Sequence, residues 1–111
     1  MVDRKTRIYN IKYETVYPMY LEKVEKKGRT KAELNEVLSW LTGLKHPEDY
    51  QGSYEAFQSQ AQVPASASEI KGLICGVRVE EIEDPVIKFM RQMDKVVDEL
   101  AKGKTMEKII R

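Results

Sequence analysis

The chain has little of the residue types that most often build disulfides and metal centres. Among its 111 residues there is one cysteine, Cys75, and one histidine, His46. A single cysteine cannot form an intrachain disulfide, which fits a reducing compartment. No apolar run approaches the roughly 20 residues needed to span a bilayer, and no signal peptide follows Met1. We therefore expect a cytoplasmic protein that makes no use of a membrane.

The motifs of familiar enzymes are missing as well. The sequence contains no phosphate-binding loop, dinucleotide fingerprint, serine-hydrolase elbow, zinc-ligand spacing or EF-hand loop. We accordingly predict no cofactor and no metal, and a protein that is not an enzyme is favoured over an enzyme. An unfamiliar enzyme stays open, because the missing motifs exclude only the familiar ones.

No excess of one charge is present over the whole chain. The 19 basic and 18 acidic residues give a net charge of +1, so no global field attracts nucleic acid or anionic lipid. The charge is unevenly placed, however. Residues 1–31 carry nine Lys or Arg against four Asp or Glu, whereas residues 32–70 carry one against six. This asymmetry suits contact with a partner or with a second copy.

Two helices joined by a short turn are predicted over residues 15–42. Thr15 is suited to cap the first helix, which we expect to end at Gly28. Thr30 and Glu33 form a capping box at the start of the second. Apolar residues then repeat at the helical spacing: Leu34, Val37, Leu38 and Leu41.

A long C-terminal helix is predicted between Asp84 and Gly103. Asp84 followed by Pro85 is a strong helix start, with the aspartate as cap. The apolar seam of this helix steps by four and three positions: Val86, Met90, Met93, Val97 and Leu100. The seam is most simply intramolecular core, and a dimer face is the alternative.

The remaining segments are less regular. Residues 1–14 read as an N-terminal arm or a short strand, because Tyr9, Ile11 and Tyr13 alternate. Residues 44–69 form a variable loop region with one short helical stretch. Residues 70–83 fit a helix or a strand, and a helix is favoured.

The fold class predicted is mostly α. We expect a compact single domain over residues 1–111 with four to six helices, an N-terminal αα-hairpin and the long C-terminal helix. Segments 8–12 and 73–79 are candidates for a minor strand pair.

Three strings together resemble a known family: VYPMYLEKVEKKGRTKAELNEVLSWLTG at 16–43, CGVRVEEIEDP at 75–85 and MDKVVDELAKGKTMEKIIR at 93–111. The chain resembles a bacterial family known as domain of unknown function 2200, least closely over residues 44–72. The resemblance implies a small bacterial cytoplasmic protein. It carries over no activity and no functional residue.

The candidate catalytic residues are Cys75, Arg78 and Glu80. Arg78 lies near the thiol in sequence and could lower its pKa, while Glu80 opens an acidic cluster that ends at Asp84. The alternative is structural: a buried inert thiol, an arginine paired with the acids, and Asp84 acting as a helix cap.

The candidate partner-binding residues are Lys26, Lys27 and Arg29 in the turn of the αα-hairpin, together with Trp40. A basic turn can contact phosphates, but acidic residues interleave with the lysines and residues 32–44 contain no Lys or Arg. Nucleic-acid binding is therefore disfavoured. Trp40 lies off the apolar stripe of its helix, so a partner or a second helix layer could cover it.

Aromatic side chains gather in the first half of the chain. They suit either a core or a ligand pocket between helices. They are Tyr13, Tyr17, Tyr20, Trp40, Tyr50, Tyr54 and Phe57.

Three function classes follow from the sequence. The favoured one is a protein-interaction or regulatory module that self-associates or binds an unknown protein partner. The second is a small-molecule-binding protein or enzyme with a site around Cys75–Asp84. The third is nucleic-acid binding through the basic turn.

Overall fold

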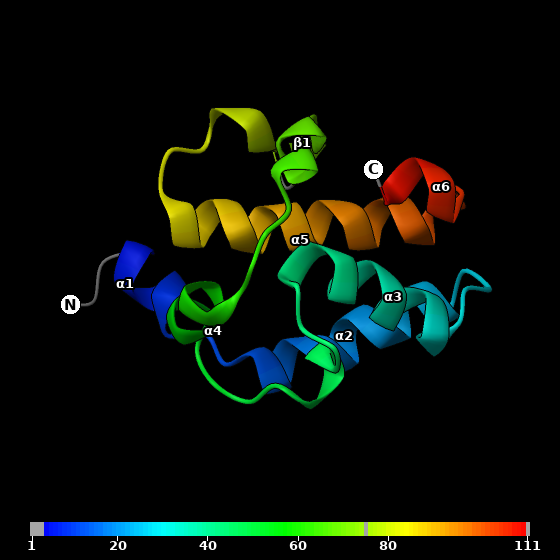
Figure 1. Ribbon diagram of the computed structural model, residues 1–111, viewed down its shortest axis with the longest axis horizontal. Helices are drawn as coiled ribbons and strands as arrows, with labels where there is room; N and C mark the ends of the chain where they lie inside the picture. The colour runs from blue at the N-terminus through cyan, green and yellow to red at the C-terminus, as the bar shows by residue number, and fades with distance from the viewer. Residues whose placement is uncertain (1–3, 75, 111) are drawn as a thin grey trace.

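The computed structural model describes residues 4–74 and 76–110, and the fold is mostly α, as predicted (Figure 1). The α-helices of this part of the chain are α1 (Arg4–Tyr9), α2 (Tyr13–Glu25), α3 (Lys31–Thr42), α4 (Tyr54–Gln60), α5 (Pro85–Ala101) and α6 (Met106–Ile109). Its short elements are the 3-10 turns η1 (Pro47–Asp49), η2 (Ala65–Glu69) and η3 (Val79–Glu81), and the strands β1 (Leu73–Ile74) and β2 (Val77–Arg78).

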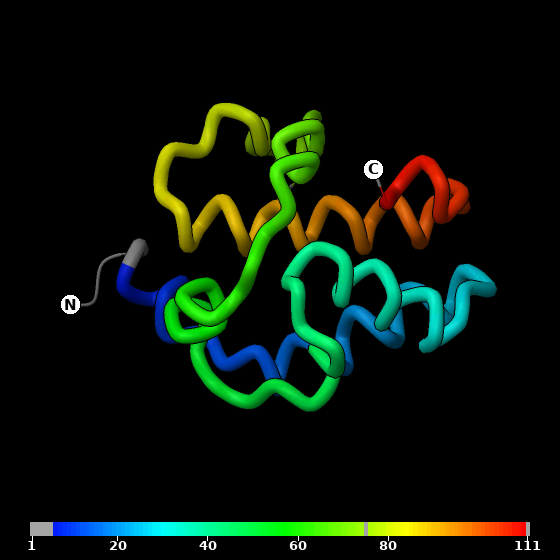
Figure 2. Tube along the Cα trace, in the orientation of Figure 1, coloured from blue at the N-terminus to red at the C-terminus, as the bar shows by residue number. Residues whose placement is uncertain are grey.

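Helix α5 is the centre of the molecule. Its start follows from the sequence, because the Asp84 side chain accepts hydrogen bonds from the amides of Val86 and Ile87 at 3.0 Å each. Helices α2, α3 and α4 all pack against α5. Figure 2 shows the chain after α4 crossing α5, so that α4 and the β1–β2 hairpin lie on opposite sides of that helix.

The apolar seam of α5 is intramolecular core. Val86, Met90, Met93, Val97 and Leu100 are all buried within the chain, none of them more than 7% exposed. Burial of such a seam is the main stabilising contribution that a helix of this kind makes. The seam is therefore not available as a dimer face while this fold is intact.

The αα-hairpin is present, with a change at its start. The capping box of Thr30 and Glu33 is complete at the start of α3, as predicted. The prediction that Thr15 caps α2 is wrong, since the helix begins at Tyr13. The Thr15 hydroxyl instead donates a hydrogen bond to the carbonyl of Lys12, 2.7 Å away.

The strand interpretation of residues 8–12 is also wrong. Tyr9 closes α1 and Tyr13 opens α2, so the alternating apolar residues reach the core from two helices and the link between them. The starts of α2 and α4 are joined by two backbone hydrogen bonds. The amide of Tyr13 donates to the carbonyl of Gly52 (2.8 Å), and the amide of Tyr54 donates to the carbonyl of Ile11 (3.0 Å). Each bond satisfies an amide that the first turn of a helix leaves unpaired.

The helix favoured for residues 70–83 is absent from the described part of that segment. A strand pair forms there instead, with Leu73 opposite Arg78 and Ile74 opposite Val77. The pairing lies wholly within this segment and does not involve residues 8–12. Gly72 and Gly76 adopt φ angles of 110° and 79°, which interrupt a helix and favour a turn.

Candidate ligand-binding pocket

A pocket of about 340 Å³ lies between α1, α2, α4 and α5. Its apolar wall comes from three of these helices and the link after α1: Ile8 of α1, Ile11 of the link, Val16 of α2 and Met90 of α5. Its volume falls at the lower end of the range of about 300–1,000 Å³ that is usual for small-molecule sites. The paired starts of α2 and α4 hold the walls together.

The polar side of the pocket is a hydrogen-bonded network. The Tyr20 hydroxyl donates to Oδ1 of Asp94 and lies 3.2 Å from the Tyr54 hydroxyl. Oδ2 of Asp94 accepts from Nη1 of Arg91 at 3.3 Å. Arg7 of α1 lines the same pocket and is itself exposed. Four helices thus contribute one polar group or more each.

Burial controls the protonation of this network. It raises the pKa of Asp94 above the ordinary value of 3.8, and the Tyr20 hydrogen bond and the Arg91 charge offset only part of that effect. Burial likewise raises the pKa of Tyr20 and of Tyr54, so both hydroxyls keep their protons at neutral pH. The network therefore presents neutral phenols beside a carboxylate whose proton affinity is increased.

The other aromatic residues form core beneath the pocket. Phe57 is fully buried and stacks on Tyr50 with a centroid distance of 4.2 Å. It meets Tyr13 at 4.5 Å and Phe89 of α5 at 5.3 Å, both edge to face. This cluster fixes α4 on α5 and so places Tyr54 at the pocket. Trp40 is partly buried and packs against the core from α3.

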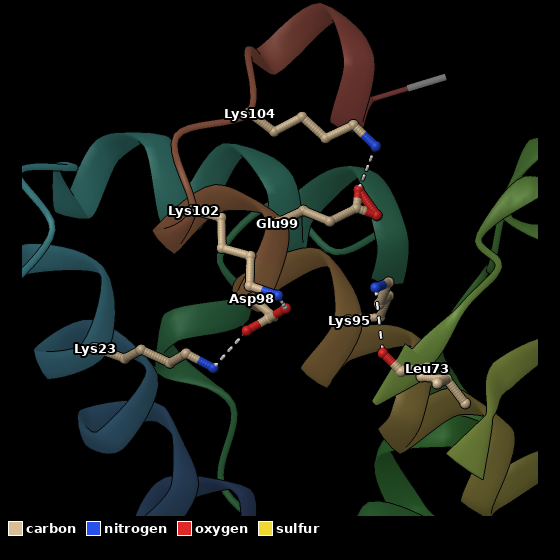
Figure 3. Close-up of polar contacts among 7 residues, drawn as sticks. All are labelled: Lys23, Leu73, Lys95, Asp98, Glu99, Lys102 and Lys104. Carbon is tan, nitrogen blue, oxygen red and sulfur yellow. Dashed lines mark hydrogen bonds and ion pairs between the residues drawn. The ribbon is translucent and has the colours of Figure 1, made fainter. Parts of the chain in front are cut away.

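The C-terminal part of α5 carries several ion pairs (Figure 3). Asp98 contacts Nζ of Lys23 at 3.2 Å and Nζ of Lys102 at 3.1 Å. Glu99 contacts Nζ of Lys104 at 2.9 Å. Lys95 donates to the carbonyl of Leu73 at 3.3 Å and so ties the hairpin to the helix.

The predicted catalytic residues do not line this pocket. Arg78 and Glu80 are both exposed, on β2 and η3. The Glu80 carboxylate accepts a hydrogen bond from the amide of Gly72 at 3.0 Å, which braces the hairpin and lowers the pKa of Glu80. Cys75 lies outside the described residues, so a site that includes its thiol stays a prediction.

Two of the basic residues predicted to bind a partner form ion pairs with acidic residues of the same chain. Lys26 contacts Glu22 at 3.2 Å, and Arg29 contacts Glu33 at 2.8 Å. Lys27 is exposed. The contacts follow from the interleaving of acids and bases along α2 and α3, which is typical of a solvated face.

Sequence reasoning missed three pocket residues: Arg7, Arg91 and Asp94. Tyr20 and Tyr54 belong to the aromatic residues of the first half of the chain, for which a ligand pocket was one of two interpretations. This clustering of aromatic residues was the signal that the sequence offered. The lining residues come from four helices with no fixed spacing, so no local pattern joins them.

Over the described ranges, 4–74 and 76–110, none of the helices is both long and apolar enough to cross a membrane. Within the same ranges, no three His, Cys, Asp or Glu side chains come together in a way that could hold a metal ion.

The structure defines a mostly helical protein with a small amphipathic pocket between its helices. Residues 7–111 match the model of a family described as uncharacterized protein conserved in bacteria, domain of unknown function 2200, and the chain belongs to this family. A crystal structure of the uncharacterized protein SP1917 is similar, with a TM-score of 0.83 and 40% identity over 93% of this chain and 89% of that one. None of the curated proteins matches the chain.

Proposed function

We propose that the protein binds a small molecule in the pocket between α1, α2, α4 and α5. The observation that carries the proposal is the pairing of an apolar wall with the Tyr20–Tyr54–Asp94 network in one cavity. Small-molecule sites combine a mostly apolar lining with a few fixed polar groups that orient the ligand.

Native mass spectrometry of the purified protein tests this proposal. A mass in excess of the denatured mass reports a retained small molecule. Val16→Phe fills the pocket from α2 and should abolish the excess. Leu21→Phe is the matched control, because Leu21 lies on the same helix and lines a shallow groove elsewhere.

If no extra mass is present, a panel of small metabolites is screened by thermal shift on the wild type and both variants. Binding lost in Val16→Phe and kept in Leu21→Phe supports the pocket. Equal binding by all three proteins, or no binding in either assay, contradicts it.

A second candidate is self-association or protein binding through the outer face of α2. Met19 is 59% exposed there, and with Lys26 and Lys27 it lines a shallow groove. An exposed apolar side chain framed by charged ones is a common element of interfaces. Sedimentation of the wild type and of Met19→Lys tests it: a dimer that dissociates in the variant supports this surface, and a monomeric wild type contradicts self-association.

The cellular location also stays a prediction. The single cysteine supports the cytoplasm.

A further inference from the structure

The pocket offers more hydrogen-bond donors than acceptors. Both carboxylate oxygens of Asp94 are already engaged, Oδ1 by Tyr20 and Oδ2 by Arg91. The Tyr20 and Tyr54 hydroxyls lie 3.2 Å apart, and the Tyr54 hydroxyl also donates to Sδ of Met93 at 3.7 Å. Each carboxylate oxygen of Asp94 thus already has one donor from within the protein.

The unused hydrogen-bond donors among the lining residues are N–H groups of the two arginines, Arg7 and Arg91. A guanidinium carries five N–H groups, and Arg91 uses one of them on Asp94. The guanidinium of Arg7 forms no ion pair with any residue in the described ranges. Arg7 of α1 and Arg91 of α5 both line this one pocket.

The charges of the lining residues select the charge of the ligand. Arg7, Arg91 and Asp94 together leave one positive charge in excess. One carboxylate neutralises it and matches the planar fork of a guanidinium. A dianionic phosphate would instead leave the cavity negative.

We infer that the ligand is a small monocarboxylate with a short apolar body, held by Arg7 and Arg91 and packed against Ile8, Ile11, Val16 and Met90. This inference rests on the proposed small-molecule function. The apolar wall takes the hydrocarbon or aromatic body, and the cavity volume of about 340 Å³ limits its size. Asp94 acts as the positioning residue that fixes the Arg91 guanidinium beside the pocket.

A charge series on one hydrocarbon body tests the inference. The probes are 4-methylpentanoate, 4-methylpentan-1-ol and 4-methylpentan-1-amine, and their dissociation constants are measured by ligand-observed NMR. The carboxylate should bind tightest and the amine weakest. Arg7→Gln should weaken carboxylate binding by about tenfold, the loss expected for one charge-assisted hydrogen bond, and should leave alcohol binding unchanged.

Arg78→Gln is the matched control, because Arg78 is an exposed arginine on β2, away from the pocket. It should leave all three constants unchanged. An alcohol or amine that binds as tightly as the carboxylate overturns the inference about charge and leaves the small-molecule function standing. Equal losses in Arg7→Gln and Arg78→Gln also overturn it, because they indicate attraction to the whole protein. If no probe binds to the wild type, the inference about this class of ligand is wrong.

Discussion

Asp94 and Asp98 lie one helical turn apart on α5, and their pKa values are shifted in opposite directions. Asp94 and Asp98 are similarly accessible, with side chains 22% and 16% exposed. The pKa of Asp94 is raised, because burial outweighs its contacts with Tyr20 and Arg91. Burial also raises the pKa of Asp98, but hydrogen bonds from Lys102 and Lys23 outweigh it and the net pKa is lowered.

The difference shows that the balance between burial and partners sets the direction of each pKa shift. Asp94 faces phenols and one arginine beside a cavity, whereas Asp98 holds two lysines at the surface. The N-terminal half of α5 is therefore organised around a pocket and its aromatic support. The C-terminal part of α5 buries Val97 and Leu100 in the core and carries the ion pairs of Asp98 and Glu99 beside them.

The largest expected effect is the loss of stability when the aromatic support at the pocket end of α5 is removed. Phe89→Ala removes a ring that is 2% exposed and packs edge to face on Phe57. The loss of burial and the cavity left behind should lower the free energy of unfolding by about 3–5 kcal/mol. Urea denaturation measures it. A loss below about 1 kcal/mol would mean that the aromatic cluster does not support this half of α5.

Substitutions of two tyrosines on α2 test whether the hydrogen bonds of the pocket network contribute to stability. Tyr20→Phe removes the hydrogen bond to Oδ1 of Asp94 and should destabilise the protein by about 1–3 kcal/mol. Tyr13→Phe is the matched control, because the buried Tyr13 hydroxyl has no hydrogen-bond partner among the described residues. That change should be neutral or stabilising. Equal losses from the two substitutions, measured by urea denaturation, would contradict the network.

The pH dependence of stability should separate the two aspartates. Native Asp94 binds its proton more tightly than the unfolded chain does, so acidification through its raised pKa, above 3.8, stabilises the fold. Native Asp98 binds its proton less tightly, so its contribution is present above 3.8 and is lost as the pH falls below that value.

The variants Asp94→Asn and Asp98→Asn test these signs by urea denaturation between about pH 3 and pH 7. Asp94→Asn should lose the stabilisation that the wild type gains on acidification above pH 3.8. Asp98→Asn should lose less stability than the wild type below pH 3.8. Parallel curves for the two variants would show that the aspartates do not differ.

The smallest expected effect belongs to the surface ion pairs. Lys23→Ala removes one of the two cations on Asp98, and the Lys23 side chain is 45% exposed. Solvent screening limits such a pair to about 0–1 kcal/mol. Thermal unfolding at low and high salt measures it, and high salt should remove the difference. A loss as large as that of Tyr20→Phe would show that the C-terminal half of α5 also depends on buried polar contacts.

Local signals explain which parts of the fold were predictable. Thr30 with Glu33 and Asp84 with Pro85 define helix starts within four residues, and both are present. The alternation of Tyr9, Ile11 and Tyr13 wrongly predicted a strand. Tyr9 ends α1 and Tyr13 begins α2, and the meeting of these two helices depends on tertiary packing. The pocket was not predictable, because Arg7 and Asp94 become neighbours only when α1 and α2 both pack beside α5.

The most direct test is an NMR titration that follows the side-chain carboxyl carbons of Asp94 and Asp98 in one sample, first alone and then with 4-methylpentanoate. The account predicts an Asp94 midpoint above 3.8 and an Asp98 midpoint below it, with the added carboxylate shifting the Asp94 signal and leaving that of Asp98 in place. Coincident midpoints, or equal responses of both aspartates to the added carboxylate, would contradict it.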